Sequence, residues 1–78
     1  MRAYVLIQLN KSREREIVEK LKSMKHVKSA HILFGEWDII VEVEVENAED
    51  LGTFVMDNIR SIDEVDLTSS LIVAGWKQ

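Results

Sequence analysis

Cysteine and proline are absent from this chain of 78 residues, and glycine occurs only three times. Without cysteine, neither a disulfide framework nor a thiolate metal site can form, so an intracellular location is the simplest expectation. No apolar run approaches the roughly 20 residues that a bilayer span requires, and the first residues lack the pattern of a signal peptide. These absences predict a cytoplasmic protein that does not enter a membrane.

Positive charge is also in short supply. The formal net charge is −4, whereas a nucleic-acid surface needs an excess of lysine and arginine on one face. Four lysines cluster around the end of the first expected helix, where cations complement the helix dipole. They are Lys20, Lys22, Lys25 and Lys28. We therefore expect no direct DNA binding.

The length predicts one domain covering residues 1–78, because a chain this short cannot be divided into two cores. A domain of this size is marginal as a lone core, yet 46% of its residues are apolar. We expect it to share part of its surface with another copy of itself.

Hydrophobic periodicity predicts six elements. Strands alternate apolar residues with period two, and helices repeat them every three or four residues. Turn or N-cap chemistry precedes each helix, at Asn10-Lys11-Ser12 and at Asn47. The expected order is strand 2–9, a helix around 17–24, strand 27–34, strand 37–46, a helix around 51–62 and strand 65–74.

This order is that of the ferredoxin-like α+β fold, a four-stranded antiparallel sheet with both helices on one face. The first and third strands should be central, since the first is apolar on both sides. The face away from the helices would show Tyr4, Leu6, Ile40 and either Leu71 or Ile72. Because such an apolar patch is larger than a small monomer usually exposes to solvent, we predict that a second subunit covers it.

The turn Phe34-Gly35-Glu36-Trp37-Asp38 joins two predicted strands. A glycine that adopts positive φ without steric cost suits a tight hairpin connection. A turn that carries a ring, a carboxylate and free backbone amides is also suited to holding a small polar ligand. Asp38 would then bind an ammonium group, or alternatively serve only the turn.

Two further sets of polar residues are candidates for a site. Thr68 and Ser70 share one face of the last strand, where their hydroxyls could contact a carboxylate or an amide. The alternative is that these polar residues only protect an edge strand from aggregation. His26 and His31 are five residues apart and would point to opposite faces of a strand, so they form no metal pair. We expect no metal, no cofactor and no catalytic residue.

Taken together, these residues resemble the effector-binding (RAM) domain of the Lrp/AsnC family of transcriptional regulators. The resemblance runs from Ala3-Tyr4-Val5 through the glycine-x-aromatic-aspartate turn to Val65-Asp66-Leu67-Thr68-Ser69-Ser70. It implies dimers that join sheet against sheet and assemble into rings such as octamers or decamers. It also implies an amino acid or related effector bound where dimers meet, contacted by Gly35, Glu36, Trp37, Asp38, Thr68 and Ser70.

Family members commonly carry a helix-turn-helix domain, whereas this chain begins at the first strand and resembles the stand-alone form. Such a form would act through other proteins, for example by assembling with full-length Lrp/AsnC regulators. Trp37 and Ser70 replace the residues common in the family pattern, which leaves the effector open. The rival interpretation is a small dimeric α+β barrel enzyme, a monooxygenase or isomerase, for which His31 and Trp37 are the candidate groups.

Overall fold

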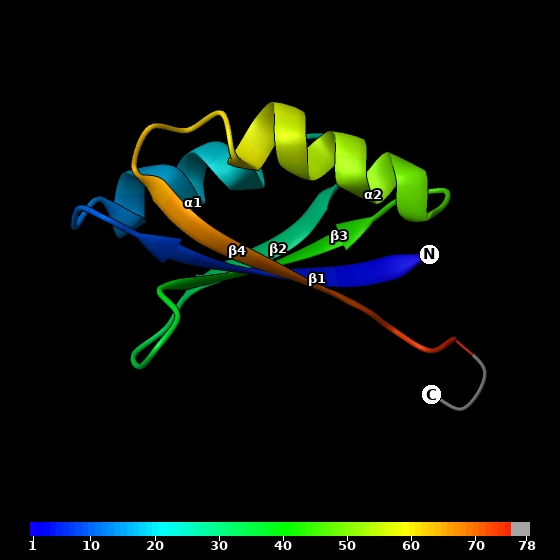
Figure 1. Cartoon of the computed structure of the whole chain (residues 1–78), viewed down its shortest axis with the longest axis horizontal. Coiled ribbons are helices and arrows are strands. Elements are labelled where there is room, and N and C mark those ends of the chain that lie inside the picture. Colours follow the sequence, from blue (N-terminus) through cyan, green and yellow to red (C-terminus); the bar gives the residue numbers. More distant parts are fainter. Residues whose placement is uncertain (76–78) are drawn as a thin grey trace.

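Residues 1–75 of the chain are described by a computed structural model. The elements are β1 (Arg2–Leu9), α1 (Glu14–Lys22), β2 (Val27–Ile32), β3 (Ile39–Glu44), α2 (Ala48–Phe54), the π-helical turn η1 (Val55–Ile59) and β4 (Val65–Ile72). The strands form one antiparallel sheet in the order β2-β3-β1-β4. Both helices cover the same face of that sheet (Figure 1). The predicted ferredoxin-like fold and the central places of β1 and β3 are therefore confirmed.

The core lies between the sheet and the helices, where alternate residues of β1 and β3 point at the apolar stripes of α1 and α2. Its fully buried large side chains are Val5, Ile7, Leu21, Ile39, Val41, Val43 and Ile59. Those on β1 and β3 alternate with Tyr4, Leu6 and Ile40, which periodicity assigned to the opposite face. No helix within residues 1–75 is long and apolar enough to cross a membrane.

The N-cap predictions for the two helices had different outcomes. Asn47 caps α2 as predicted, since its side-chain oxygen accepts a hydrogen bond from the Asp50 N–H at 2.8 Å. The predicted N-cap before α1 is wrong, because Arg13 occupies that position and makes no side-chain cap bond. The Ser12 hydroxyl instead donates to Glu14 Oε1 at 3.0 Å.

Several element ends fall short of the prediction. β2 stops at Ile32 and β3 begins at Ile39, so the turn is longer than expected and contains Phe34 and Trp37. β4 ends at Ile72 rather than at residue 74. The second helix closes with η1, where the α-helical bonding gives way to the wider π pattern. Periodicity alone does not distinguish strand from strand-like turn at such ends.

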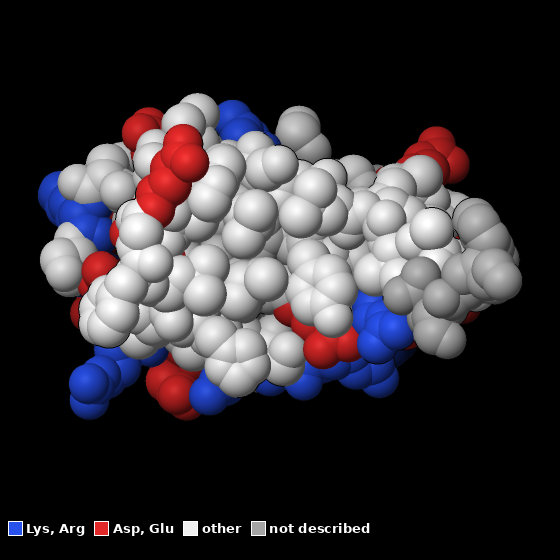
Figure 2. Space-filling view, turned by 90° about the horizontal axis from the view of Figure 1, so that it is seen from below, with Lys and Arg blue, Asp and Glu red and all other residues white. Residues whose placement is uncertain are grey.

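The open face of the sheet, which lacks helices, carries a largely uncharged surface with charged side chains mainly along its margins (Figure 2). Leu6 lies opposite both Ile40 and Ser69, and Tyr4 lies opposite Leu71. Leu71 is 51% exposed, while the other three apolar side chains are partly buried. Ile72 was the alternative choice for this face, but it pairs with the buried Ala3 and therefore belongs to the helix side.

Candidate functional site

The turn between β2 and β3 is a closed hairpin loop that hangs below the open face of the sheet (Figure 1). The Leu33 N–H donates to the Asp38 carbonyl and the Asp38 N–H donates to the Ile7 carbonyl, both at 2.8 Å. Gly35 has φ +135°, a conformation that side chains oppose. The predicted role of Gly35 as the turn glycine is confirmed.

Asp38 is tied to the end of β1. Its Oδ2 atom accepts a hydrogen bond from the Leu9 N–H at 2.7 Å, and the carboxylate is partly buried there. The same side chain lines a hollow of about 240 Å³ together with the loop that leads into α1, formed by Leu9, Asn10, Lys11, Ser12 and Glu14. Asp38 thus serves the fold already, and it also lines a space large enough for a small polar group.

The neighbours of Asp38 in the turn differ in exposure. The Glu36 carbonyl accepts a hydrogen bond from Gln8 Nε2 at 3.0 Å, which holds the loop against the open face. Glu36 itself is exposed and Trp37 is half-buried. Phe34 is completely exposed at 103%, although periodicity assigned it to a strand. A fully exposed aromatic ring is a candidate contact with another copy of the chain.

The hydroxyl pair lies on the other side of the sheet. Thr68 is opposite Ile7 and Ser70 is opposite Val5, so both share the helix-facing side of β4 with these core residues. Thr68 Oγ1 accepts a hydrogen bond from Arg60 Nη1 at 3.3 Å. Ser70 is exposed, because the helices cover the central strands and leave this part of β4 open.

A single chain therefore separates the two halves of the predicted site. Asp38 and Thr68 flank Ile7 from opposite sides, which places their backbones about 10 Å apart across β1. The turn extends below the sheet, whereas Thr68 and Ser70 point toward the helix layer. Within one copy, the tip of the turn and the two hydroxyls therefore lie on different sides of the sheet.

The two histidines occupy separate environments, as their spacing predicted. The His26 ring packs edge-on against Phe54 with centroids 5.9 Å apart and an interplanar angle of 87°. His31 lies on the edge strand β2, opposite Ile40, and is exposed. Within the described part of the chain, no three histidine, aspartate or glutamate side chains lie close enough to hold a metal ion.

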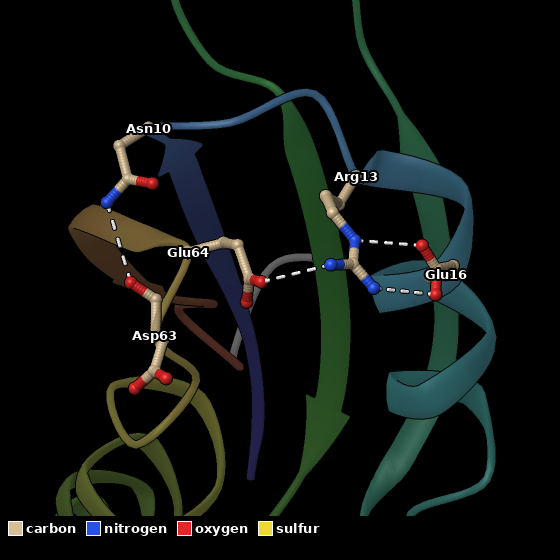
Figure 3. Close-up of polar contacts among 5 residues, drawn as sticks. All are labelled: Asn10, Arg13, Glu16, Asp63 and Glu64. Atoms are coloured by element: carbon tan, nitrogen blue, oxygen red, sulfur yellow. Dashed lines mark hydrogen bonds and ion pairs between the residues drawn. The ribbon is translucent and has the colours of Figure 1, made fainter.

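An ion-pair junction joins the start of α1 to the start of β4 near the candidate site (Figure 3). Arg13 donates from Nε and Nη2 to the two carboxylate oxygens of Glu16, both at 2.8 Å, and its Nη1 lies 3.6 Å from Glu64 Oε2. The hydrogen bond and the positive charge of Arg13 lower the pKa of Glu16 below its ordinary value. Asn10 Nδ2 also donates to the Asp63 carbonyl at 3.5 Å. Sequence reasoning missed this junction, because its partners are up to about 50 residues apart.

The comparisons with known proteins agree on one family. Residues 2–75 match the model of the Lrp/AsnC ligand binding domain. A Pyrococcus furiosus HTH-type transcriptional regulator, PF0250, is 33% identical over 73 residues, which cover 90% of this chain and 49% of the regulator. The chain spans about half the length, or less, of the curated relatives it matches.

Solved structures share the fold. The crystal structure of FFRP-DM1 superposes with a TM-score of 0.85 at 39% identity and covers 92% of this chain and 96% of its own. A transcriptional regulator of Neisseria meningitidis, NMB0573 in complex with L-Met, superposes with a TM-score of 0.82 at 21% identity and covers 99% of this chain and 52% of its own.

Proposed function

Because this chain belongs to the Lrp/AsnC ligand-binding domain family, we propose that it is an oligomeric amino-acid sensor that regulates through partner proteins and catalyses no reaction. The matched model describes a ligand-binding domain, and the relatives are transcriptional regulators. The net charge of −4 argues that any effect on DNA is exerted through a partner such as a full-length Lrp/AsnC regulator in the cytoplasm.

The dimer forms through the open face of the sheet. Tyr4, Leu6, Ile40 and Leu71 lie close together there, and charged side chains surround them mainly at the margins (Figure 2). A specific interface buries about 800 Å² per partner, which is a large share of one sheet face. Two copies placed sheet against sheet would remove these apolar side chains from water and give a dimeric α/β barrel.

The effector site is shared between copies of the chain. The observation that carries this proposal is the separation of the turn and the hydroxyl pair on opposite sides of one sheet. The turn of one copy, with Gly35, Glu36, Trp37 and Asp38, would meet Thr68 and Ser70 of a copy in another dimer. Neither half encloses a ligand alone, so assembly and effector binding depend on each other.

The chemistry of the two halves suits an amino acid. The free oxygen of Asp38 and the exposed carboxylate of Glu36 attract an ammonium group, and hydroxyl and backbone N–H groups are donors for a carboxylate. The half-buried ring of Trp37 offers an apolar surface for the effector side chain. L-methionine, found with the Neisseria structural neighbour, is a sensible first member of any effector panel.

The enzyme alternative lacks support from the geometry. A small α+β barrel enzyme needs a pocket between sheet and helices, and here buried apolar side chains fill that space. Its two candidate groups are separated, since His31 lies on the outer edge strand and Trp37 lies in the turn.

The test is a thermal-shift and calorimetric screen of the oligomer against the twenty amino acids. An effector at a hundredfold excess over its Kd should stabilise the protein by about 2.7 kcal/mol, which raises Tm by about 10–20 °C for a chain of this length. Mass spectrometry of the recovered effector should show no conversion. A panel without any response would refute amino-acid sensing, and turnover would favour the enzyme.

A further inference from the structure

A single arginine lies beside the hydroxyl pair of β4. Arg60 donates a hydrogen bond from Nη1 to Thr68 Oγ1 at 3.3 Å, and its side chain is exposed. It is the only lysine or arginine within residues 29–76. The half of the effector site that carries Thr68 and Ser70 therefore has a positive charge next to it, on a residue that sequence reasoning did not select.

Arg60 has no carboxylate partner among residues 1–75, although acidic residues are close to it in the sequence. Asp57 is three residues earlier, a spacing at which helical side chains are ordinarily neighbours. Glu64 is four residues later, but it pairs with Arg13 at 3.6 Å (Figure 3). A guanidinium presents five N–H donors in a planar fork that matches a carboxylate. Only one hydrogen bond of the Arg60 side chain, to Thr68, lies within the described part of the chain.

The π-helical turn η1 accounts for the direction of this side chain. The Arg60 N–H donates to the Val55 carbonyl at 2.8 Å, five residues back, where an α-helix would bond four residues back. One extra residue in a turn rotates the positions that follow by about 100° around the helix axis. The irregular turn thus presents Arg60 to β4 and not to Asp57. Turns of this kind frequently occur at functional sites.

The two hydroxyls complete a patch of hydrogen-bond donors. Because Thr68 Oγ1 accepts its bond from Arg60, the Thr68 hydroxyl keeps its own hydrogen to donate. Ser70 follows two residues later on the same side of β4 and is exposed. One guanidinium fork and two hydroxyls on one side of a strand suit a carboxylate, since hydrogen bonds between a cation and a carboxylate are the strong ones.

We propose that Arg60 recognises the carboxylate of the effector, together with Thr68 and Ser70 of the same copy. This inference rests on the proposed function, in which Asp38 of another copy attracts the ammonium group. It fixes the orientation of the amino acid, with its carboxylate toward β4 and its ammonium group toward the turn. It also restricts the class of effector to molecules with a free carboxylate, so that amines and amino-acid amides bind poorly.

The experiment is calorimetric titration of the full chain with L-methionine and L-methioninamide, and then with the other amino acids, each beside its amide. An amide keeps the ammonium group and the side chain but replaces the carboxylate with a neutral group. The wild type should bind the acid about tenfold or more tightly than the amide. Arg60→Gln should lose this preference by weakening the acid alone. Arg60→Lys should keep part of it, because the charge remains without the fork.

Two further variants separate carboxylate recognition from other effects. Asp38→Asn should weaken the acid and its amide by the same factor, since both carry the ammonium group. Lys20→Gln removes an exposed positive charge from α1 and should change neither affinity. The circular dichroism spectrum and light scattering of Arg60→Gln without ligand should match those of the wild type, because the bond to Thr68 is exposed.

The outcomes distinguish this inference from the proposed function. An Arg60→Gln variant that still prefers the acid, or a wild type that binds acid and amide alike, would overturn the role of Arg60 and leave amino-acid sensing in place. A wild type that binds none of the amino acids would overturn both.

Discussion

The hydrogen bond between Asp38 and Leu9 allows the structural and effector roles of one carboxylate to be separated. In Asp38→Ala the Leu9 N–H loses its acceptor at 2.7 Å, and hydrogen bonds to charged groups contribute about 1.5–3 kcal/mol. A 60–100-residue domain loses about 4–8 °C per kcal/mol, so Tm should fall by about 6–24 °C. Asp38→Asn keeps an oxygen as acceptor and should cost about 0.5–1.5 kcal/mol.

The effector response should behave differently in these variants. If the charge contributes about 2.7 kcal/mol to binding, its removal weakens affinity about a hundredfold. An effector concentration that stabilises the wild type by about 2.7 kcal/mol would then stabilise Asp38→Asn by only about 0.4 kcal/mol. The neutral amide should therefore lose most of the response to the effector while keeping most of the stability.

Thermal unfolding with and without effector measures both quantities, with light scattering to verify that the dimer persists. Asp66→Asn is the matched control, since it removes an exposed carboxylate at the start of β4 and should change neither quantity. A full effector shift in Asp38→Asn would show that the carboxylate is not part of the site. Wild-type stability in Asp38→Ala would refute the structural role assigned to the bond.

Three further predictions follow from the fold. Leu6→Glu places a charge in the open-face interface and should give monomers or unfolded protein by light scattering, whereas Leu6→Met should remain a dimer. Gly35→Ala should cost about 1–3 kcal/mol in denaturant titrations because φ is +135° there; Gly52→Ala should instead stabilise the subunit by about 1 kcal/mol. Glu16→Gln removes the carboxylate that pairs with Arg13. In the folded wild type, this pairing lowers the pKa of Glu16 below its ordinary value. The wild type should therefore be the more stable protein above the ordinary glutamate pKa, and urea titrations should find this advantage lost as pH falls through the lowered value.

The sheet order and the core followed from periodicity, because the positions that alternate along β1 and β3 are the ones the helices bury. The ends of the strands could not be predicted from periodicity in the same way. Phe34 and Trp37 continue the apolar pattern of their strands, but the turn that Gly35 and Asp38 close takes them out of the sheet. The face of Ile72 also needed the β1–β4 register, which includes an irregularity at Gln8 and Leu9.

The candidate site was predicted as a set of residue types and not as an arrangement. Glycine, aspartate and paired hydroxyls could be recognised locally, since each depends on one turn or on one strand face. Whether Thr68 and Asp38 face one another depends on which side of the sheet each uses, and that is fixed by pairing with Ile7 and by the path of the loop.

In the proposed sensor, the division of the effector site between copies couples effector binding to assembly. An effector held by the turn of one dimer and the hydroxyl pair of another binds the assembly better than it binds the free dimer. By linkage, the factor by which assembly raises effector affinity is the factor by which effector strengthens assembly. A coupling of about 1–3 kcal/mol, the usual range for such effects, changes association by about 5–150-fold. No rearrangement inside the 78-residue subunit is then required, since the number of joined copies is itself the signal a partner protein reads. Effector binding to protein diluted until only dimers remain should accordingly be weaker by that same factor, and equal affinity would separate sensing from assembly.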